Sequence, residues 1–488
     1  MHMVRTSPTP SRTRGAAGLL GLVAPLLLAA GGGPVEPGHP NVLWIITDQH
    51  RADVAGYEGD PFGATPSLDA LAKQSVRVSE LYCQAPLCVP ARQSILTGQY
   101  AHTNGAFRNS SEFPPEQRTI AGAFADAGYD TALIGKSHCN TAGFQYVREF
   151  REQYDAFLEQ HPDGARPGAE NYRFRKSGNF EFVLTMNPEN LSAGEGPRFF
   201  MEQSVVDDTL AYLKQRDPER PFFVWASFLS PHPPLYAPDS FRERFADAPL
   251  PLRGTMKEEE PGLLAVHRGR RAEQGLDEIT DDQLLEITRA YYAALAWSDH
   301  CIGELLRGLA EQGLADDTLV VYTSDHGEML GEHGLLQKRA FFDGASRVPC
   351  MLRWPGHLEA GAVRDRVAQH VDLTATVLDL AGVPPPDGNV GRSMRELLAN
   401  PAAPWEDFAL SELSGTAASP TVRWMMRRGR FKYEWHSADV QALFDLETDP
   451  GELHNLVDDP EHAEVVAAMR ARYEAVSEAT DWAVPRGR

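Results

Sequence analysis

The chain has 488 residues, of which 42% are hydrophobic, and is therefore long enough for one large globular domain with a smaller appendage. Its formal net charge of -22 argues against nucleic acid and anionic membrane surfaces as partners, and an anionic substrate would need a local positive pocket. The five cysteines are odd in number and too sparse for a disulfide scaffold.

The N-terminus has the pattern of a secretory signal peptide. Arginines precede the apolar run 16–30, and Ala29 and Gly31 offer small residues at a cleavage site. The run is shorter than the roughly 18 residues of a membrane-spanning helix. We expect residues 1–31 to be removed and the protein to be exported, periplasmic or secreted, without stable membrane insertion afterwards. A disordered extension from a misassigned start codon is the alternative.

Apolar runs alternating with helical patterns follow. Each of four such runs ends at or just before a polar side chain, and these are Asp48, Lys136, His232 and Asp325. Strands that alternate with helices predict an α/β fold with a mostly parallel sheet and helices on both faces. Because sites in open α/β sheets form outside the carboxyl ends of strands, the four side chains are expected at one edge of the sheet. Taken singly, each could be a loop residue or a helix cap.

The character of the chain changes after the proline-rich stretch 382–388. Residues 423–437 and 442–450 alternate like strands with turn signals, and residues 461–480 form an amphipathic helical pattern. We therefore predict a catalytic domain over 41–400 and a small α+β domain over 405–488.

Two adjacent polar pairs at strand ends suggest a metal site. Asp48 with Gln49, and Asp325 with His326, offer hard oxygen ligands that suit Ca²⁺, Mg²⁺ or Mn²⁺, and the imidazole tilts the choice toward Mn²⁺. For residues 325–328 the alternative is a helix N-terminus capped by Asp325.

Five cationic or imidazole side chains stand in small-residue or proline-marked contexts, namely Arg92, Lys136, His138, His232 and Lys338. Converging cations around a metal are what a tetrahedral oxyanion needs. By themselves, Lys338 would read as a surface charge and the two histidines as structural residues.

Six blocks in order along the chain resemble the sulfatase family, from about residue 41 to the end. They are NVLWIITDQHRAD, CVPAR with QSILTG, GYDTALIGKSH, SFLSPHPP, SDHGEMLGEHGLLQKRAFFDGASRVPCMLRWPG and LFDLETDPGELHNL. The resemblance implies an alkaline phosphatase-like fold. It also implies that Cys88 is oxidised by a separate maturation enzyme to formylglycine, whose hydrate attacks sulfur and later releases free sulfate.

The resemblance implies a role for each matched residue. One divalent ion, Ca²⁺ first with Mn²⁺ or Mg²⁺ as alternatives, would be held by residue 88 with Asp48, Gln49, Asp325 and His326. Around the substrate, Arg92 would steady the aldehyde hydrate, Lys136 and Lys338 would hold sulfate oxygens, His138 would hydrogen-bond the nucleophile and act as base, and His232 would protonate the departing alcohol. The substrate would be a sulfated small molecule or carbohydrate.

Two departures from the family keep alternatives open. Gln49 and His326 stand where many sulfatases have Asp and Asn, and the same Asp-Gln and Asp-His pairs occur in related phosphonate monoester hydrolases and in some sulfatases. Lys136 and His138 are similar to the sulfatase form. A phosphonate or phosphate ester hydrolase is one alternative, and a sulfated-glycan-binding protein without catalysis is the other. The leaving group would be recognised by loops 149–198 and 239–275, which are expected to be irregular.

Overall fold

The computed structural model describes residues 39–114, 116–161, 200–254, 265–414, 422–437 and 440–480. The expected signal peptide, residues 1–31, lies outside the described residues. Within them, no helix combines the length and apolar character needed to cross a membrane.

The centre of the molecule is a nine-stranded sheet around β1 (Asn41–Asp48), in which β5 (Phe222–Pro231) and β6 (Thr318–Ser324) flank β1 in parallel and β3 (Asp130–Gly135) lies parallel to β5. The strand order is β4-β3-β5-β1-β6-β8-β2-β7, with β9 paired to β2. The remaining strands are β2 (Val76–Tyr82), β4 (Tyr146–Glu149), β7 (Arg347–Val348), β8 (Cys350–Arg353) and β9 (Val363–Gln369). Antiparallel pairs join β8 to β6 and to β2, and β7 to β2, so the prediction of a mostly parallel sheet is confirmed.

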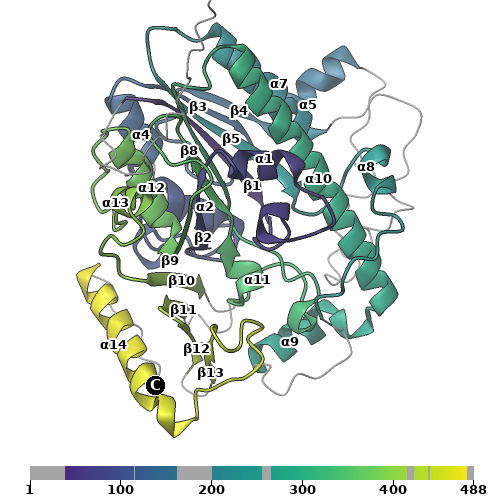
Figure 1. The fold of residues 1–488 in the computed structure, drawn as a ribbon, viewed down its shortest axis with the longest axis vertical. Coiled ribbons are helices and arrows are strands. Elements are labelled where there is room, and N and C mark those ends of the chain that lie inside the picture. The colour runs from purple at the N-terminus through teal and green to yellow at the C-terminus, as the bar shows by residue number, and fades with distance from the viewer. Residues whose placement is uncertain are drawn as a thin grey trace, which may run out of the picture.

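Helices cover both faces of this sheet (Figure 1). Alternate residues of β1 point to opposite sides, so that Leu43 packs with one buried cluster and Trp44 with the other. The first face carries α1 (Pro66–Ala72), α7 (Met201–Gln215) and α10 (Asp281–Glu311). The second carries α2 (Cys88–Thr97), α4 (Ile120–Asp126), α12 (His370–Leu380) and α13 (Arg395–Ala399).

A second, antiparallel sheet follows at the C-terminal end. It consists of β10 (Phe408–Ser414), β11 (Val422–Arg428), β12 (Phe431–Ser437) and β13 (Val440–Asp445) in that order, and α14 (Ala463–Ala479) packs on it. Trp424 of β11 stacks on Tyr473 of α14 with ring centroids 4.2 Å apart. The predicted α+β character of this region is confirmed.

The loops expected to be irregular contain helices, so that expectation is wrong where the structure describes them. They are α5 (Phe150–Gln160), α8 (Asp239–Glu243) and α9 (Ala265–Gln274). Their many charged residues hid the helical period from the sequence analysis. Residues 162–199 and 255–264 lie outside the described part. The other short helices are α3 (Ala101–Asn104), α11 (Asp343–Ser346) and 3-10 turns at Gly56–Glu58, Leu276–Glu278, Glu332–Gly334 and Pro460–His462.

Candidate active site

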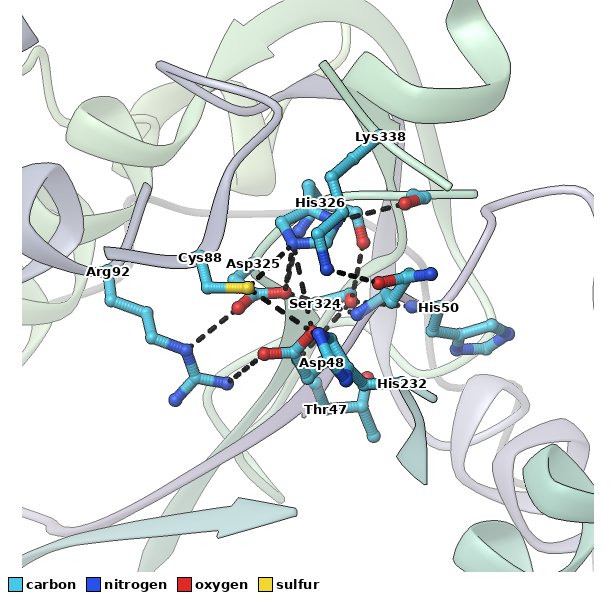
Figure 2. Close-up of polar contacts among 12 residues, drawn as sticks. Thr47, Asp48, His50, Cys88, Arg92, His232, Ser324, Asp325, His326 and Lys338 are labelled. Carbon is cyan, nitrogen blue, oxygen red and sulfur yellow. Dashed lines mark hydrogen bonds and ion pairs between the residues drawn. The ribbon is translucent and has the colours of Figure 1, made fainter. Parts of the chain in front are cut away.

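Four polar side chains stand at the carboxyl ends of parallel strands. Asp48 is the last residue of β1, and Lys136, His232 and Asp325 directly follow β3, β5 and β6. Figure 2 shows Asp48, His232 and Asp325 turned toward one another. The parallel pairing of β1 with β5 and β6 brings these strand ends to one edge, although they are far apart in the sequence.

Cys88 enters this edge from a helix. It is the first residue of α2, and its Sγ lies 3.2 Å from His326 Nε2 and 3.7 Å from Asp48 Oδ1. Burial and the Asp48 charge raise the pKa of the thiol, but the cations of Lys136, Lys338 and His326 outweigh them and hold that pKa well below its ordinary value. The site therefore favours an anionic oxygen or sulfur at residue 88.

The donor set at this edge fits a divalent cation. Asp48, Cys88, Asp325 and His326 are buried and each offers a ligand atom within 4.8 Å of the others. Burial and the charge of Asp48 raise the pKa of Asp325, because two buried carboxylates repel each other. A cation between them would relieve this repulsion. His326 Nδ1 donates to the Gly327 carbonyl at 2.9 Å, so the lone pair of Nε2 is available to the cluster.

Arg92 ties the two carboxylates to α2. It is fully buried, and its Nε donates to Asp325 Oδ2 at 2.8 Å while its Nη2 lies 3.5 Å from Asp48 Oδ2. Its Nη1 donates to Ser227 Oγ at 2.7 Å and to the Lys136 carbonyl at 3.2 Å. Ser227 was not predicted as a site residue, and its one signal in the sequence is a small polar residue inside the apolar run of β5.

Lys136 is placed by a close approach of two strands. Its Nζ donates to Asp48 Oδ2, and its backbone N–H donates to the Ser227 carbonyl at 3.0 Å. The preceding Gly135 has a φ of 101°, and a Cβ there would lie 2.1 Å from the same carbonyl oxygen. A side chain at position 135 would therefore push the lysine out of the site.

Lys338 reaches the site through Gln49. Its Nζ donates to Gln49 Oε1 at 2.5 Å, and Gln49 Nε2 donates to Glu328. Glu328 is held by the backbone N–H of Leu330 at 2.9 Å, and it turns the amide oxygen of Gln49 toward the lysine. From the sequence, Glu328 was expected only as part of a helix N-terminus. Residues 325–329 form no helix, so that alternative for the DHGE stretch is wrong.

The two remaining histidines differ in placement. His232 is half-buried, with Nε2 3.9 Å from Asp48 Oδ1, and burial together with the Lys338 charge lowers its pKa to about 4. His232 Nδ1 donates to the Pro233 carbonyl at 2.5 Å, so Nε2 is the nitrogen that faces the site. His138 is exposed, and among the described residues no hydrogen bond or ion pair joins it to Cys88.

Comparison with known families assigns nearly the whole described chain. The sulfatase family model matches residues 40–383, and the model for the C-terminal part of N-sulphoglucosamine sulphohydrolase matches residues 331–479.

Individual relatives agree with the family models. The chain is 31% identical over 454 residues to the arylsulfatase of Clostridium perfringens, covering 88% of this chain and 93% of the relative. It is 30% identical to the choline-sulfatase of Rhizobium meliloti, covering 87% and 83%. Among solved structures, the phosphonate monoester hydrolase of Agrobacterium radiobacter superposes with a TM-score of 0.74 at 25% identity, covering 90% of this chain and 96% of that one.

Proposed function

This chain belongs to the sulfatase family of sulfuric ester hydrolases, and from that premise we propose that it cleaves a sulfate monoester to an alcohol and inorganic sulfate, with residue 88 acting as formylglycine. The observation that carries the proposal is the position of Cys88. It begins a helix at the edge where two buried carboxylates, an imidazole and two lysines converge. These charged groups suit an oxyanion and a metal ion around residue 88 better than they suit an unmodified thiol.

The metal-binding residues would be Asp48, Asp325 and His326 with residue 88, which share one cluster, and Gln49. The amide oxygen of Gln49 accepts from Lys338 Nζ at 2.5 Å, so its role as a ligand is carried by the resemblance to the sulfatase family and not by the cluster. When bound, the divalent ion supplies Lewis-acid activation of the hydrated aldehyde and charge for the sulfate oxygens. Ca²⁺ is the first expectation, with Mn²⁺ or Mg²⁺ as alternatives.

The side chains around residue 88 divide the remaining work. Lys136 and Lys338 reach Asp48 and Gln49 from separate elements, so a sulfate held between the two ammonium groups would have its charge compensated from both sides. Arg92 keeps both carboxylates in place and faces residue 88 from within α2.

His232 is our candidate for protonating the leaving alcohol. Its Nε2 faces the site from the end of β5, and the Lys338 and Lys136 charges that help lower its pKa would be offset by a bound sulfate ester. His138 is our candidate for the base that assists release of sulfate from residue 88; in the part of the chain that the structure describes, no hydrogen bond or ion pair joins it to Cys88, and its place two residues after Lys136 in the family-like IGKSH stretch supports the proposal.

Mass spectrometry of the tryptic peptide 78–92 tests the nucleophile directly. Protein made in its native host or beside a maturation enzyme should carry a residue 88 that has exchanged sulfur and two hydrogens for one oxygen. An unmodified thiol under the same conditions would contradict the mechanism and favour sulfated-glycan binding without catalysis.

A formylglycine-dependent phosphonate or phosphate ester hydrolase is the second candidate. It is favoured by the structural similarity to the Agrobacterium radiobacter enzyme and by the Gln49 and His326 pair. Rates on 4-nitrophenyl sulfate and on 4-nitrophenyl phenylphosphonate separate the two. We expect the sulfate to be the faster substrate because Lys136 and His138 are similar to the sulfatase form.

We further propose that the mature protein is exported and that a formylglycine-generating enzyme is its partner before export. The arginine-flanked apolar run at residues 16–30 supports export, and the CVPAR stretch at residues 88–92 supports the partner. N-terminal sequencing of the protein recovered outside the cytoplasm tests the predicted cleavage after about residue 31.

A further inference from the structure

Three arginines that the reaction centre does not use stand close to it. Arg339 directly follows Lys338, and its backbone N–H donates to the Pro86 carbonyl at 3.0 Å, two residues before Cys88. Arg270 of α9 donates through Nη2 to the Leu336 carbonyl at 2.9 Å. Arg423 comes from β11 in the C-terminal sheet. We call these three residues the arginine cluster.

Arg270 and Arg423 each feel one carboxylate, Glu328 and Glu434 respectively, but within the described residues no ion pair joins either guanidinium group to it. Nε and Nη1 of Arg270 and Nε of Arg423 are buried and have no hydrogen-bond partner, and no ion pair is found for Arg339 within the described part of the chain. Burial and the charges of Arg339 and Arg423 outweigh the opposing charge of Glu328 and lower the pKa of Arg270 to about 9. Buried N–H donors without acceptors cost free energy, so the cluster is built as if an acceptor were to come from outside.

Two buried histidines lie beside the arginine cluster, and one ring nitrogen of each has no hydrogen-bond partner. The rings of His267 and His436 are 5.6 Å apart, and neither His267 Nε2 nor His436 Nδ1 has a hydrogen-bond partner. Arg270 and Arg423 are among the charges that lower the pKa of His267. Burial is the largest cause of that lowered pKa, and the charges of His436, Arg270, Arg423 and His333 add to it.

The same place offers ligand types that metals bind, since His267, Glu434 and His436 each have a donor atom within 4.8 Å of the others. Glu434 accepts from His436 Nε2 at 2.8 Å and is the one carboxylate of the three. Because Arg270 and Arg423 face this group, their positive charges would repel a divalent cation. An anion, in contrast, would accept hydrogen bonds from the N–H groups that have no partner.

We propose that the arginine cluster is an anion subsite, and that the substrate is a sulfate ester whose leaving group carries a second sulfate or a carboxylate. This rests on the proposed function of the reaction centre. Arg339 and the Leu336 anchor of Arg270 lie one and two residues from Lys338, and two residues span at most roughly 7 Å. The second anionic group therefore belongs to the same or a neighbouring unit of a sulfated oligosaccharide, and a small neutral alcohol would leave the subsite unused.

Calorimetric binding to the full chain carrying Cys88→Ala tests the subsite without turnover. The probes are fully sulfated maltotetraose, a tetrasaccharide of glucuronate that carries carboxylates alone, and glucose 6-sulfate, which has a single anionic group. The ratio of affinities for the sulfated tetrasaccharide and glucose 6-sulfate should fall roughly tenfold in R270Q and in R423Q and roughly a hundredfold in the double variant, because each loses a charged hydrogen-bond donor. A similar fall for the glucuronate tetrasaccharide would assign the subsite to carboxylates as well, whereas a fall for sulfate alone would restrict it to sulfate.

Matched variants separate this result from general effects. R307Q removes one exposed positive charge from α10 and should leave the ratio unchanged, and R423K should keep most of the affinity because it retains the charge. Melting temperatures show whether each variant is folded. The proposal is overturned if the folded double variant keeps the parent ratio, or if R307Q lowers it equally. Because binding is measured without turnover, an unmodified residue 88 would overturn the proposed function and leave this result intact.

Discussion

The reaction centre and the arginine cluster are two charged regions built in opposite ways. In the reaction centre, Arg92 and Lys136 bond directly to the buried carboxylates. In the arginine cluster, Arg270 and Arg423 have buried N–H groups without acceptors. The first region is therefore organised before substrate arrives, whereas in our proposal the second is completed by the anion that binds there.

Cys88→Ala should affect the two regions most differently, because it should abolish turnover and leave binding to the arginine cluster unchanged. Removing the nucleophile should lower kcat on 4-nitrophenyl sulfate by about 10⁴-fold or more, since the remaining groups bind but cannot attack. Binding of sulfated maltotetraose should persist, because the arginine cluster is untouched. Steady-state kinetics beside calorimetry measure both, and residual turnover within tenfold of the parent would show that residue 88 is not the nucleophile.

Arg92→Gln and Arg270→Gln should differ strongly in stability. Arg92 is fully buried between Asp48 and Asp325, and its loss leaves two buried carboxylates uncompensated, which we expect to cost about 3–5 kcal/mol of unfolding free energy. Arg270→Gln breaks no ion pair with a carboxylate and should lower the free energy of unfolding by less than about 1 kcal/mol. Urea unfolding of both variants provides the comparison, and equal losses would show that the pairing in the reaction centre is not what stabilises it.

Removal of the metal should destabilise the reaction centre alone. Without a cation, Asp48 and Asp325 repel each other, so EDTA should abolish activity and lower the unfolding free energy by about 2.7 kcal/mol relative to protein with metal at a hundred times its Kd. Adding back Ca²⁺, Mn²⁺ and Mg²⁺ in turn identifies the ion. Affinity of the arginine cluster for sulfated maltotetraose should change less than activity does. Unchanged activity and melting temperature after chelation would argue against the metal site.

The smallest expected effect is on the pH dependence of stability, and it comes from His370, a buried neutral histidine outside both regions. Burial lowers the pKa of His370 to about 3, against an ordinary value of about 6.5. Below pH 6.5 the unfolded chain binds a proton that the folded chain does not, so stability falls as pH drops from about 6.5 toward 3. His370→Gln should flatten this fall by up to about 1.4 kcal/mol per pH unit between pH 6 and 5, measured by urea unfolding. An unchanged slope would mean that His370 is protonated in the folded protein.

Much of the fold was predictable because parallel strands that are buried on both faces consist of continuous apolar runs. The run at residues 41–47 became β1, and the small C-terminal sheet followed from its alternating pattern. The helices α5, α8 and α9 were not predicted, because charged residues on exposed helices blur the apolar period.

Within the candidate site, residue types and strand ends pointed to Asp48, Lys136, His232 and Asp325. Ser227 and Glu328 escaped notice because each acts only through a contact with a residue distant in sequence, Arg92 in one case and Gln49 in the other. Such contacts have no local signature.

Local pattern and motif are enough to predict the family, the order of strands and helices and the kinds of side chain available at the reaction centre. Which charges are paired depends on how the elements pack. The tertiary structure joined Arg270 of α9 and Arg423 of the C-terminal sheet beside the loop that carries Lys338, and left their N–H groups without acceptors. Pairing depends on distances between elements far apart in the chain, and those distances exist only after the sheet and its helices have packed.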